Sequence, residues 1–427
     1  MLNVLESCSA VLMLLYLSSG LTGFLAGDSP LNLWRVENNP LLLAIQTAMY
    51  AVTFSLVALH WRKFKNALQA GAWSMGLAFF AVASTLWSSD PAFTFRRSLV
   101  VVATTVFGIY FGSRFELSRQ LRLLAWAFVL LAVLSAGCAL FLPQYGIDNQ
   151  LHHGDWQGVL GQKNLLGKAM AVAIVALWSA RGLVPRVLRF VALPLCAAVM
   201  VMSGSRSSLL VCGALLLMAL GYRALRARLT TLVPIIVVVV LIAAVLVLLA
   251  LDNGSVALAY FGRSATLTRR TEIWSAVWNF ISARILLGYG FTAFWAGLQG
   301  ESAQVAARLG FVARHAHDGF LDLWLELGIV GLLVFAAGYF QALRHGIRLL
   351  RMTHARFASW PLLYLTFIFL YDLAEGPILR QNNLYWALYV AAAVSAAQAV
   401  RVRQASRVSL PITAPHPHLE QQPDYLS

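Results

Sequence analysis

Histidine and acidic side chains cluster at residues 314–328, which read RHAHDGFLDLWLELG within strongly apolar surroundings. Asp318, Asp322 and Glu326 recur every four residues, so they share one face of a helix. An unpaired acid inside a bilayer costs about 2.5–3.5 kcal/mol or more, so these acids need water or a charged partner. His317, next to Asp318, is a candidate general base, because a neighbouring carboxylate orients and tunes an imidazole for proton transfer.

Two other interpretations of this stretch stay open. In the structural one, the acids simply form ion pairs with arginines such as Arg314 or Arg380. In the metal one, His315, His317 and Asp318 bind zinc. Their spacing of two residues is not the i, i+4 spacing of a helical zinc site, and no cysteine joins them. We therefore expect no metal and no cofactor.

Arginines that could bind an anion occur near two expected helix starts. Arg206 stands alone in a short turn, SGSRSS, between two apolar segments, and Arg269 and Arg270 precede a helical pattern that begins near Thr271. A guanidinium close to hydroxyls and to the free amides of a helix N-terminus matches the geometry of a phosphate. The alternative is an arginine that snorkels to the membrane interface.

Two further polar stretches interrupt the apolar sequence. Residues 152–168, HHGDWQGVLGQKNLLGK, include Trp156, Lys163 and Asn164 and suit a sugar or a diphosphate, or else form an interfacial loop anchored by the tryptophan. Residues 372–383, DLAEGPILRQNN, contribute Glu375 and Arg380. We expect these stretches and the histidine run to lie at one end of the molecule.

The amino-acid composition predicts the fold that holds these residues in place. The chain has 427 residues, of which 60% are hydrophobic and 11% are charged, whereas a soluble domain carries about 25% charged residues. Apolar segments recur throughout, so we predict an all-α polytopic membrane protein with about twelve transmembrane helices. Their expected limits are 8–25, 41–60, 68–87, 98–113, 121–141, 165–180, 187–203, 207–222, 231–251, 319–343, 359–373 and 383–400.

The basic residues predict the orientation of these spans. With both termini in the cytoplasm, every inner connection carries at least three Lys or Arg, and 19 of the 32 lie on that side. The net charge of +15 is therefore a topology signal, and nucleic acid is excluded as a partner. Four domains follow. Residues 1–251 form spans one to nine, 252–318 a long outer segment with an amphipathic helix on the membrane surface, 319–400 spans ten to twelve, and 401–427 a disordered tail.

Taken together, the polar pieces and their order resemble the O-antigen ligase superfamily, which includes bacterial exopolysaccharide polymerases. The resemblance spans most of the chain. The pieces that carry it are LWSSDP at 86–91, RR at 96–97, GQKN at 161–164, GSRSS at 204–208, RTEIW at 270–274, LGYG at 287–290, HAHD at 315–318, ELG at 326–328, Glu375 and RQNN at 380–383.

The resemblance implies a metal-independent glycosyltransferase of the bacterial inner membrane with its active site on the periplasmic side. Its donor is a glycan on undecaprenyl diphosphate, the long outer segment is periplasmic, and membrane lipids surround the spans. In the family, arginines at the positions of Arg206 and Arg270 are associated with the donor diphosphate, and a histidine at that of His317 is the proposed base. Where the family has His-Asn, this chain has His317-Asp318, and an acid there is expected to raise the pKa of the histidine.

The expected site therefore has three sets of residues. The catalytic set is His317 and Asp318, and the diphosphate set is Arg206, Arg270, Arg269 and Lys163. The substrate set is Asn164, Trp156, Glu375, Arg380 and His315.

The acceptor separates the alternatives within the family. We favour an O-antigen ligase, which transfers the glycan to the lipid A-core, over a polymerase, which transfers it to a second lipid-linked saccharide. A third relative transfers to protein hydroxyls. A transporter of lipid-linked saccharides ranks lower, because such proteins have broken helices and internal repeats, whereas these spans look continuous.

Overall fold

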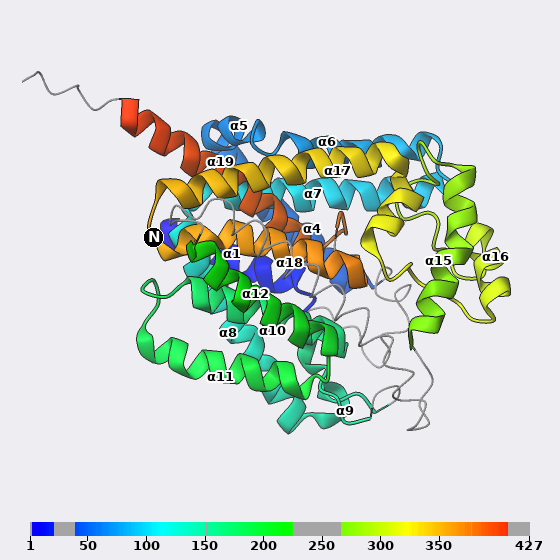
Figure 1. Ribbon diagram of the computed structural model, residues 1–427, viewed down its shortest axis with the longest axis horizontal. Coiled ribbons are helices and arrows are strands. Elements are labelled where there is room, and N and C mark those ends of the chain that lie inside the picture. The colour runs from blue at the N-terminus through cyan, green and yellow to red at the C-terminus, as the bar shows by residue number, and fades with distance from the viewer. Residues whose placement is uncertain (1, 21–38, 150–152, 225–265, 377, 409–427) are drawn as a thin grey trace, which may run out of the picture.

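The computed structural model describes residues 2–20, 39–149, 153–224, 266–376 and 378–408. Within these ranges the regular structure is helical, apart from two isolated bridges. Several of the longer helices, such as α7 and α17, lie along the long axis of the molecule, whereas α15 runs across it (Figure 1). The helices of four turns or more are α1 (Leu2–Leu17), α4 (Pro40–Leu59), α7 (Pro91–Arg114), α8 (Leu117–Phe141), α10 (Lys163–Ser179), α11 (Arg186–Met202), α12 (Arg206–Ala224), α15 (Thr266–Ala283), α17 (Gly319–Met352), α18 (Trp360–Glu375) and α19 (Leu384–Val408).

Shorter helices complete the described chain. They are α5 (Trp61–Leu68), α6 (Ala72–Ala83), η1 (Ser84–Leu86), α9 (Pro143–Gly146), η2 (Gly158–Leu160), α16 (Gly300–Leu309) and η4 (Arg356–Ser359). The all-α prediction is confirmed for this part of the chain. Helices overlap every predicted apolar segment except 231–251, which lies outside the described residues.

Some of these helices are long and apolar enough to cross a membrane, as predicted. By length and apolar composition, α4, α7, α8 and α17 can each cross a membrane. The pair α5 and α6, bent by 86°, counts as a fifth if it is one span. The count of twelve spans stays a prediction. The expected disordered tail is partly wrong, because α19 continues to Val408, and the rest of the tail lies outside the described residues.

Small residues bring the central helices together. On α7, a Cβ atom at Gly108 would lie 2.7 Å from the carbonyl oxygen of Ala387, and one at Gly112 would lie 2.9 Å from that of Ala391. Two glycines four residues apart thus let α7 and α19 pack backbone to backbone, as in many transmembrane helix pairs. Beside them α10 is apolar on all sides and almost wholly buried, which makes it a core element of the bundle.

The two ends of the bundle carry different elements. Figure 1 shows the N-terminus, α5 and the last turns of α19 at one end, and α15 and α16 at the other. The first end carries the basic residues Arg62, Lys63 and Lys65 of α5. The second end carries the predicted histidine and arginine residues that the following subsection describes.

The amphipathic helix of the predicted outer segment exists, but its apolar face is covered by protein. Ile273, Val277 and Ile281 of α15 are each at most 2% exposed, in a small core with Tyr289 and Leu325. The expectation that this face lies on the membrane is therefore wrong. Helical periodicity shows that one face must be buried, but it does not show what covers that face.

A break near the outer end of α17 shapes the site. Gly328 has φ 67° and ψ −173°, a conformation essentially restricted to glycine. Residues 285–290 run beside the break and bind the freed backbone groups: Tyr289 N–H donates to Leu325 C=O at 2.8 Å, and Ile329 N–H donates to Ile285 C=O at 2.8 Å. Two pieces of the sequence pattern, LGYG at 287–290 and ELG at 326–328, are thus bound to each other.

Candidate active site

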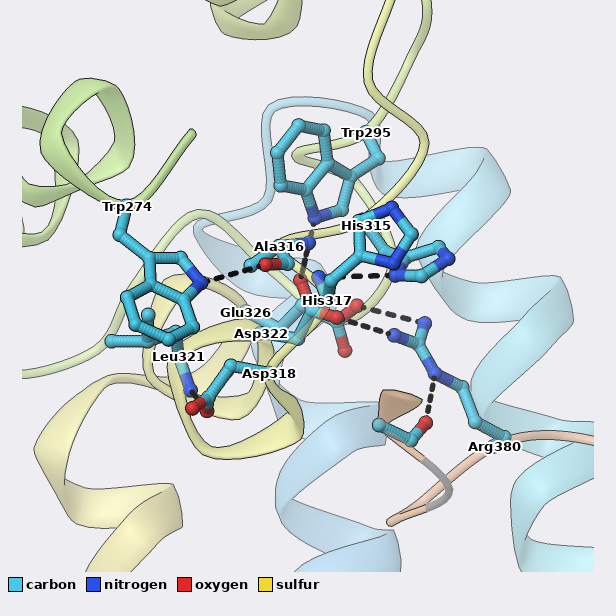
Figure 2. Close-up of polar contacts among 11 residues, drawn as sticks. Trp274, Trp295, His315, Ala316, His317, Asp318, Leu321, Asp322, Glu326 and Arg380 are labelled. Carbon is cyan, nitrogen blue, oxygen red and sulfur yellow. Dashed lines mark hydrogen bonds and ion pairs between the residues drawn. The ribbon is translucent and has the colours of Figure 1, made fainter. Parts of the chain in front are cut away.

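The loop before α17 is held from two sides. The indole Nε1–H of Trp274, on α15, donates to the carbonyl oxygen of Ala316 at 2.9 Å, and the N–H of Ala316 donates to Asp322 Oδ1 at 2.9 Å. Asp318 caps α17 by accepting a hydrogen bond from the N–H of Leu321 at 3.0 Å. Figure 2 shows these contacts converging on the loop that carries the two histidines. The loop conformation is therefore fixed by side chains of α15 and α17.

The two histidines of this loop lie ring against ring. The ring centroids of His315 and His317 are 4.0 Å apart, and the backbone N–H of His317 donates to His315 Nδ1 at 3.1 Å. A ring nitrogen that accepts a hydrogen bond carries no proton, so His315 is neutral with its proton on Nε2. His317 has φ +53°, an uncommon conformation for a residue with a side chain.

Burial keeps both imidazoles neutral. Burial, followed by His315 and Arg270, lowers the pKa of His317 to about 4, against smaller opposing effects of Glu375 and Asp322. Burial likewise lowers the pKa of His315 to about 4, with contributions from Arg380, Lys168 and Arg270. The expectation that Asp318 raises the pKa of His317 is wrong, because burial dominates and the Asp318 carboxylate caps the helix instead. A neutral imidazole at pH 7 is able to accept a proton.

Two acids on one face of α17 share one arginine. The guanidinium of Arg380 lies 3.0 Å from Asp322 Oδ2 and 3.3 Å from Glu326 Oε1, and its Nε–H donates to the carbonyl oxygen of Gly376 at 3.2 Å. Asp322 also accepts from Trp295 Nε1–H at 2.8 Å. The structural interpretation is thus confirmed for Asp322 and Glu326, which are 2% and 4% exposed and form ion pairs with Arg380.

A second ion pair lies deeper in the bundle. The ammonium of Lys168, on α10, is 3.0 Å from Glu375 Oε2 at the end of α18. It also lies 4.9 Å from the ring centre of Tyr371 and 5.1 Å from that of Tyr385. Gly376, the residue after Glu375, packs against the start of α17, since a Cβ atom there would lie 3.1 Å from the Cα of Gly319. Lys168 and Glu375 also act electrostatically on His315.

The helix α15 carries Arg269 and Arg270. Arg270 is half-buried in α15 and acts electrostatically on both histidines and on Asp318. The side chain of Arg269 lies outside the described residues. Because α15 begins at Thr266, both arginines lie inside the helix, and the predicted helix start near Thr271 is wrong. Arg270 is therefore not aligned with free N-terminal amides.

The other predicted residues gather around the turn that precedes α12. Lys163 Nζ lies 2.8 Å from Asp155 Oδ2, and a Cβ atom at Gly204 would lie 2.4 Å from Asp155 Oδ1. The backbone N–H of Trp156 donates to the carbonyl oxygen of Met202 at 2.9 Å. Arg206 is exposed at the first residue of α12. The loop before α10 and the arginine turn are thus packed together, with Lys163 already paired to an acid.

Hydroxyl groups link this turn to the helices of the histidine site. The side chains of Ser205 and Ser208 hydrogen-bond each other at 2.8 Å, and Ser208 also hydrogen-bonds the hydroxyl of Tyr371. Gly167 of α10 fits against the same serines, since a Cβ atom there would lie 2.6 Å from the Cβ of Ser205. Asn164, in the first turn of α10, is half-buried. Arg206 therefore stands near α10 and α18, which carry Lys168 and Glu375.

Several residues of the site were not predicted. Lys168 is a lysine inside an apolar segment, and this unusual position is the signal that marks it. Asp372 is fully buried, and a Cβ atom at Gly319 would lie 2.0 Å from its Oδ1 atom. Trp274 and Trp295 act through their indole N–H groups, and nothing in their spacing indicates it. Within the part of the chain that the structure describes, no three His, Cys, Asp or Glu side chains are placed to bind a metal ion.

The apolar helices indicate a membrane protein, and its candidate site brings histidine, arginine and acidic side chains together. Comparison with known proteins shows which family the chain resembles. A family model described as O-Antigen ligase matches residues 190–336. This range contains Arg206, Arg270 and the histidine loop, whereas Lys168 and Glu375 lie outside it.

Two relatives agree with the family match. The exopolysaccharide production protein ExoQ of Rhizobium meliloti (strain 1021) is 25% identical over 300 residues, which cover 67% of this chain and 68% of the relative. A putative polysaccharide ligase of Rickettsia prowazekii (strain Madrid E) is 30% identical over 113 residues, which cover 26% of this chain and 28% of the relative. The predicted resemblance to the O-antigen ligase superfamily is confirmed by the family match over residues 190–336 and by these two relatives.

Proposed function

We propose that the protein is a glycosyltransferase that moves a glycan from undecaprenyl diphosphate to a sugar hydroxyl. The observation that carries this proposal is the pair of half-buried, neutral imidazoles in contact with each other, on which Arg270 acts electrostatically, inside the range that matches the O-antigen ligase family. The donor diphosphate is a good leaving group, so catalysis requires a base for the acceptor and positive charge for the departing diphosphate. Both are side chains of this chain, and the proposal requires no metal and no cofactor.

In the proposed reaction His317 is the catalytic base. A ring nitrogen of His317 takes the proton of the acceptor hydroxyl as its oxygen bonds to the anomeric carbon. The bond from that carbon to the diphosphate breaks, and its electron pair leaves with the diphosphate. Arg206, Arg269 and Arg270 stabilise the growing negative charge, which fixed donors do well in a partly desolvated site. Asp318 acts through the helix cap that sets the backbone at His317.

The remaining predicted residues are assigned by their neighbourhoods. His315 and Arg380 lie around the base, and we propose that they and Glu375 line the space for the reacting sugars. Trp156, Lys163 and Asn164 lie on the side of Arg206, where we propose that they contact the donor. Because Lys163 is bound to Asp155, the donor must displace or share that ion pair.

The membrane arrangement that suits this reaction is a twelve-span protein of the bacterial inner membrane. We propose that residues 1–251 and 319–400 hold the spans, that 252–318 and the site are periplasmic, and that both termini are cytoplasmic. The separation in Figure 1 of the basic helix α5 from α15 and α16 supports this orientation. Basic connections remain preferentially in the cytoplasm.

Two acceptors are the main candidates. We propose transfer to the lipid A-core in lipopolysaccharide assembly, as an O-antigen ligase performs it. The second candidate is a polymerase that uses a second lipid-linked saccharide, and the longer match to an exopolysaccharide production protein favours it. Deleting the gene separates the two: a ligase mutant accumulates long polymer on the carrier lipid, whereas a polymerase mutant retains single capped repeats and loses long polymer.

Reconstitution tests the proposal directly. Purified protein in vesicles, given lipid-linked glycan and either acceptor, is expected to form a glycosidic bond, detected by mass spectrometry of the product. His317→Ala and Arg206→Ala are each expected to abolish transfer while the protein still inserts into the membrane. Wild-type activity in either variant contradicts the role of that residue. Movement of the glycan across the bilayer without a new bond indicates a transporter, an alternative that the break in α17 keeps relevant.

A further inference from the structure

The buried pair of Lys168 and Glu375 is not explained by stability alone. The Lys168 side chain is 5% exposed and that of Glu375 is 18% exposed, with 3.0 Å between Nζ and Oε2. Moving two charges out of water costs several kcal/mol per ion, and well-packed apolar residues in the same place are often as stable or more so. The pair therefore invites a functional explanation.

Two carboxylates, Asp322 and Glu375, act electrostatically on His317, and of these two Asp322 is the one that is paired with Arg380. Asp322 binds Arg380, Trp295 and the N–H of Ala316, as Figure 2 shows, so its charge holds the loop together. Glu375 instead faces Lys168, a lysine fixed over two tyrosine rings. Arg380 connects the two groups, since its Nε–H binds the carbonyl oxygen of Gly376, the residue after Glu375.

Charges of both signs surround the histidines. Arg270 acts on both rings, and Arg380 and Lys168 act on His315. Among the acids, Asp318 caps α17, Asp322 and Glu326 are paired with Arg380, and Asp372 is buried against Gly319. Glu375 acts on His317 and has Lys168 as its counter-ion.

We propose that Glu375 is a positioning residue that stabilises the protonated form of His317 during transfer, and that Lys168 limits how strongly it does so. This rests on the proposed function, in which His317 takes the acceptor proton. The charge on His317 appears only as the proton arrives, so Glu375 stabilises the transition state more than the bound substrates. Such a residue affects kcat rather than KM.

The two partners of this ion pair are therefore expected to act in opposite directions. Glu375→Gln removes the negative charge but keeps the shape, so protonation of His317 becomes harder. We expect kcat to fall by about 10- to 100-fold, with a smaller change in KM because Glu375 also lines the space proposed for the sugars. Lys168→Gln removes the positive charge but keeps a donor for Glu375, so His317 becomes more basic. We expect the acid limb of the pH–rate profile to move up by about one unit, with a smaller loss of kcat.

A purely structural ion pair gives a different result, because both variants break the same contact. Equal losses of kcat in the two variants, with pH–rate profiles superimposable on that of the wild type, overturn the proposal. So does a Glu375→Gln variant that loses affinity, with KM raised and kcat unchanged. The measurements use the full chain in vesicles with lipid-linked glycan and acceptor.

A second readout does not depend on transfer. Diethylpyrocarbonate reacts with neutral imidazole, so its rate of reaction with the histidines of the 311–318 loop, followed by mass spectrometry against pH, reports their protonation. We expect the midpoint to rise by about one unit in Lys168→Gln and to fall in Glu375→Gln. If the wild type transfers no glycan but the midpoints move in this way, the proposed function fails while the electrostatic coupling stands. Unmoved midpoints overturn the coupling itself.

Discussion

The glycine at the break in α17 provides a sharp test of how the site is supported. A Cβ atom at position 328 would lie 2.0 Å from the carbonyl oxygen of Leu286 and 2.4 Å from the nitrogen of Leu287. Both atoms belong to backbone, so no flexible side chain can move aside. We therefore expect Gly328→Ala to push residues 285–290 away from α17.

The size of the effect follows from the local geometry. Placing alanine at φ 67° and ψ −173° costs about 1–3 kcal/mol, because this region is essentially restricted to glycine. Displacing the loop also weakens the hydrogen bonds that Tyr289, Gly290 and Ile329 donate across the break, at about 0.5–1 kcal/mol each. Together they lower the free energy of local opening by about 3–6 kcal/mol.

Hydrogen exchange measures this opening directly. A loss of 3 kcal/mol corresponds to roughly 100-fold faster exchange at the amides of Tyr289, Gly290 and Ile329. Transfer activity is expected to fall with it, since this loop and the first part of α17 hold the site. Gly213→Ala is the matched control: a Cβ atom at Gly213 in α12 meets nothing within 4 Å, and alanine is the better helix former there.

One outcome contradicts this prediction, and a second points to a different cause. If exchange at the three amides stays within about threefold of the wild type and transfer is normal, the loop does not depend on the close approach at Gly328. Comparable losses in Gly213→Ala point to a general defect in membrane insertion instead.

Three further predictions concern the charges of the site. Asp322→Asn leaves Arg380 with one acid, and breaking a buried pair costs about 3–5 kcal/mol. Transfer should therefore fall at least about 100-fold, and hydrogen exchange in residues 311–318 should accelerate. Normal transfer contradicts the role of Asp322. With the pKa of His317 lowered to about 4, the base stays neutral to about pH 5, so transfer should decline only below that, and a decline centred near pH 6.5 is the opposing result. The unfolded chain binds a proton between pH 6.5 and 4 that the folded site does not, so the stability of the site also falls as pH falls through that window. Chelators such as EDTA should leave transfer unchanged, and a loss that added metal restores would revive a metal site at His315.

Much of the fold was predictable because the signal is local. Apolar length defines the spans, and helices lie at the predicted segments throughout the described chain. The four-residue spacing of Asp322 and Glu326 required a shared partner, and Arg380 was among the two named for it. Charged residues in an apolar segment thus need a partner of opposite charge or contact with water.

What failed depends on contacts between distant segments. The face of α15 was predictable as apolar, but that α16 and α17 cover it was not. The direction of the pKa shift at His317 needed the burial of its ring, and the local sequence offered only the neighbouring acid Asp318. The pairing of Lys168 with Glu375 joins α10 to α18 and depends on how those helices pack, which no residue spacing encodes.

The two ion pairs of Arg380 have a consequence for how the protein is made. Asp322 and Glu326 precede their arginine by 58 and 54 residues, and α18 lies between them. When α17 leaves the ribosome it therefore carries two acids whose arginine is not yet synthesised. Its first turns are expected to remain in water or at the insertion machinery until α18 and the following loop arrive, so the site is completed last, by the hairpin of α18 and α19.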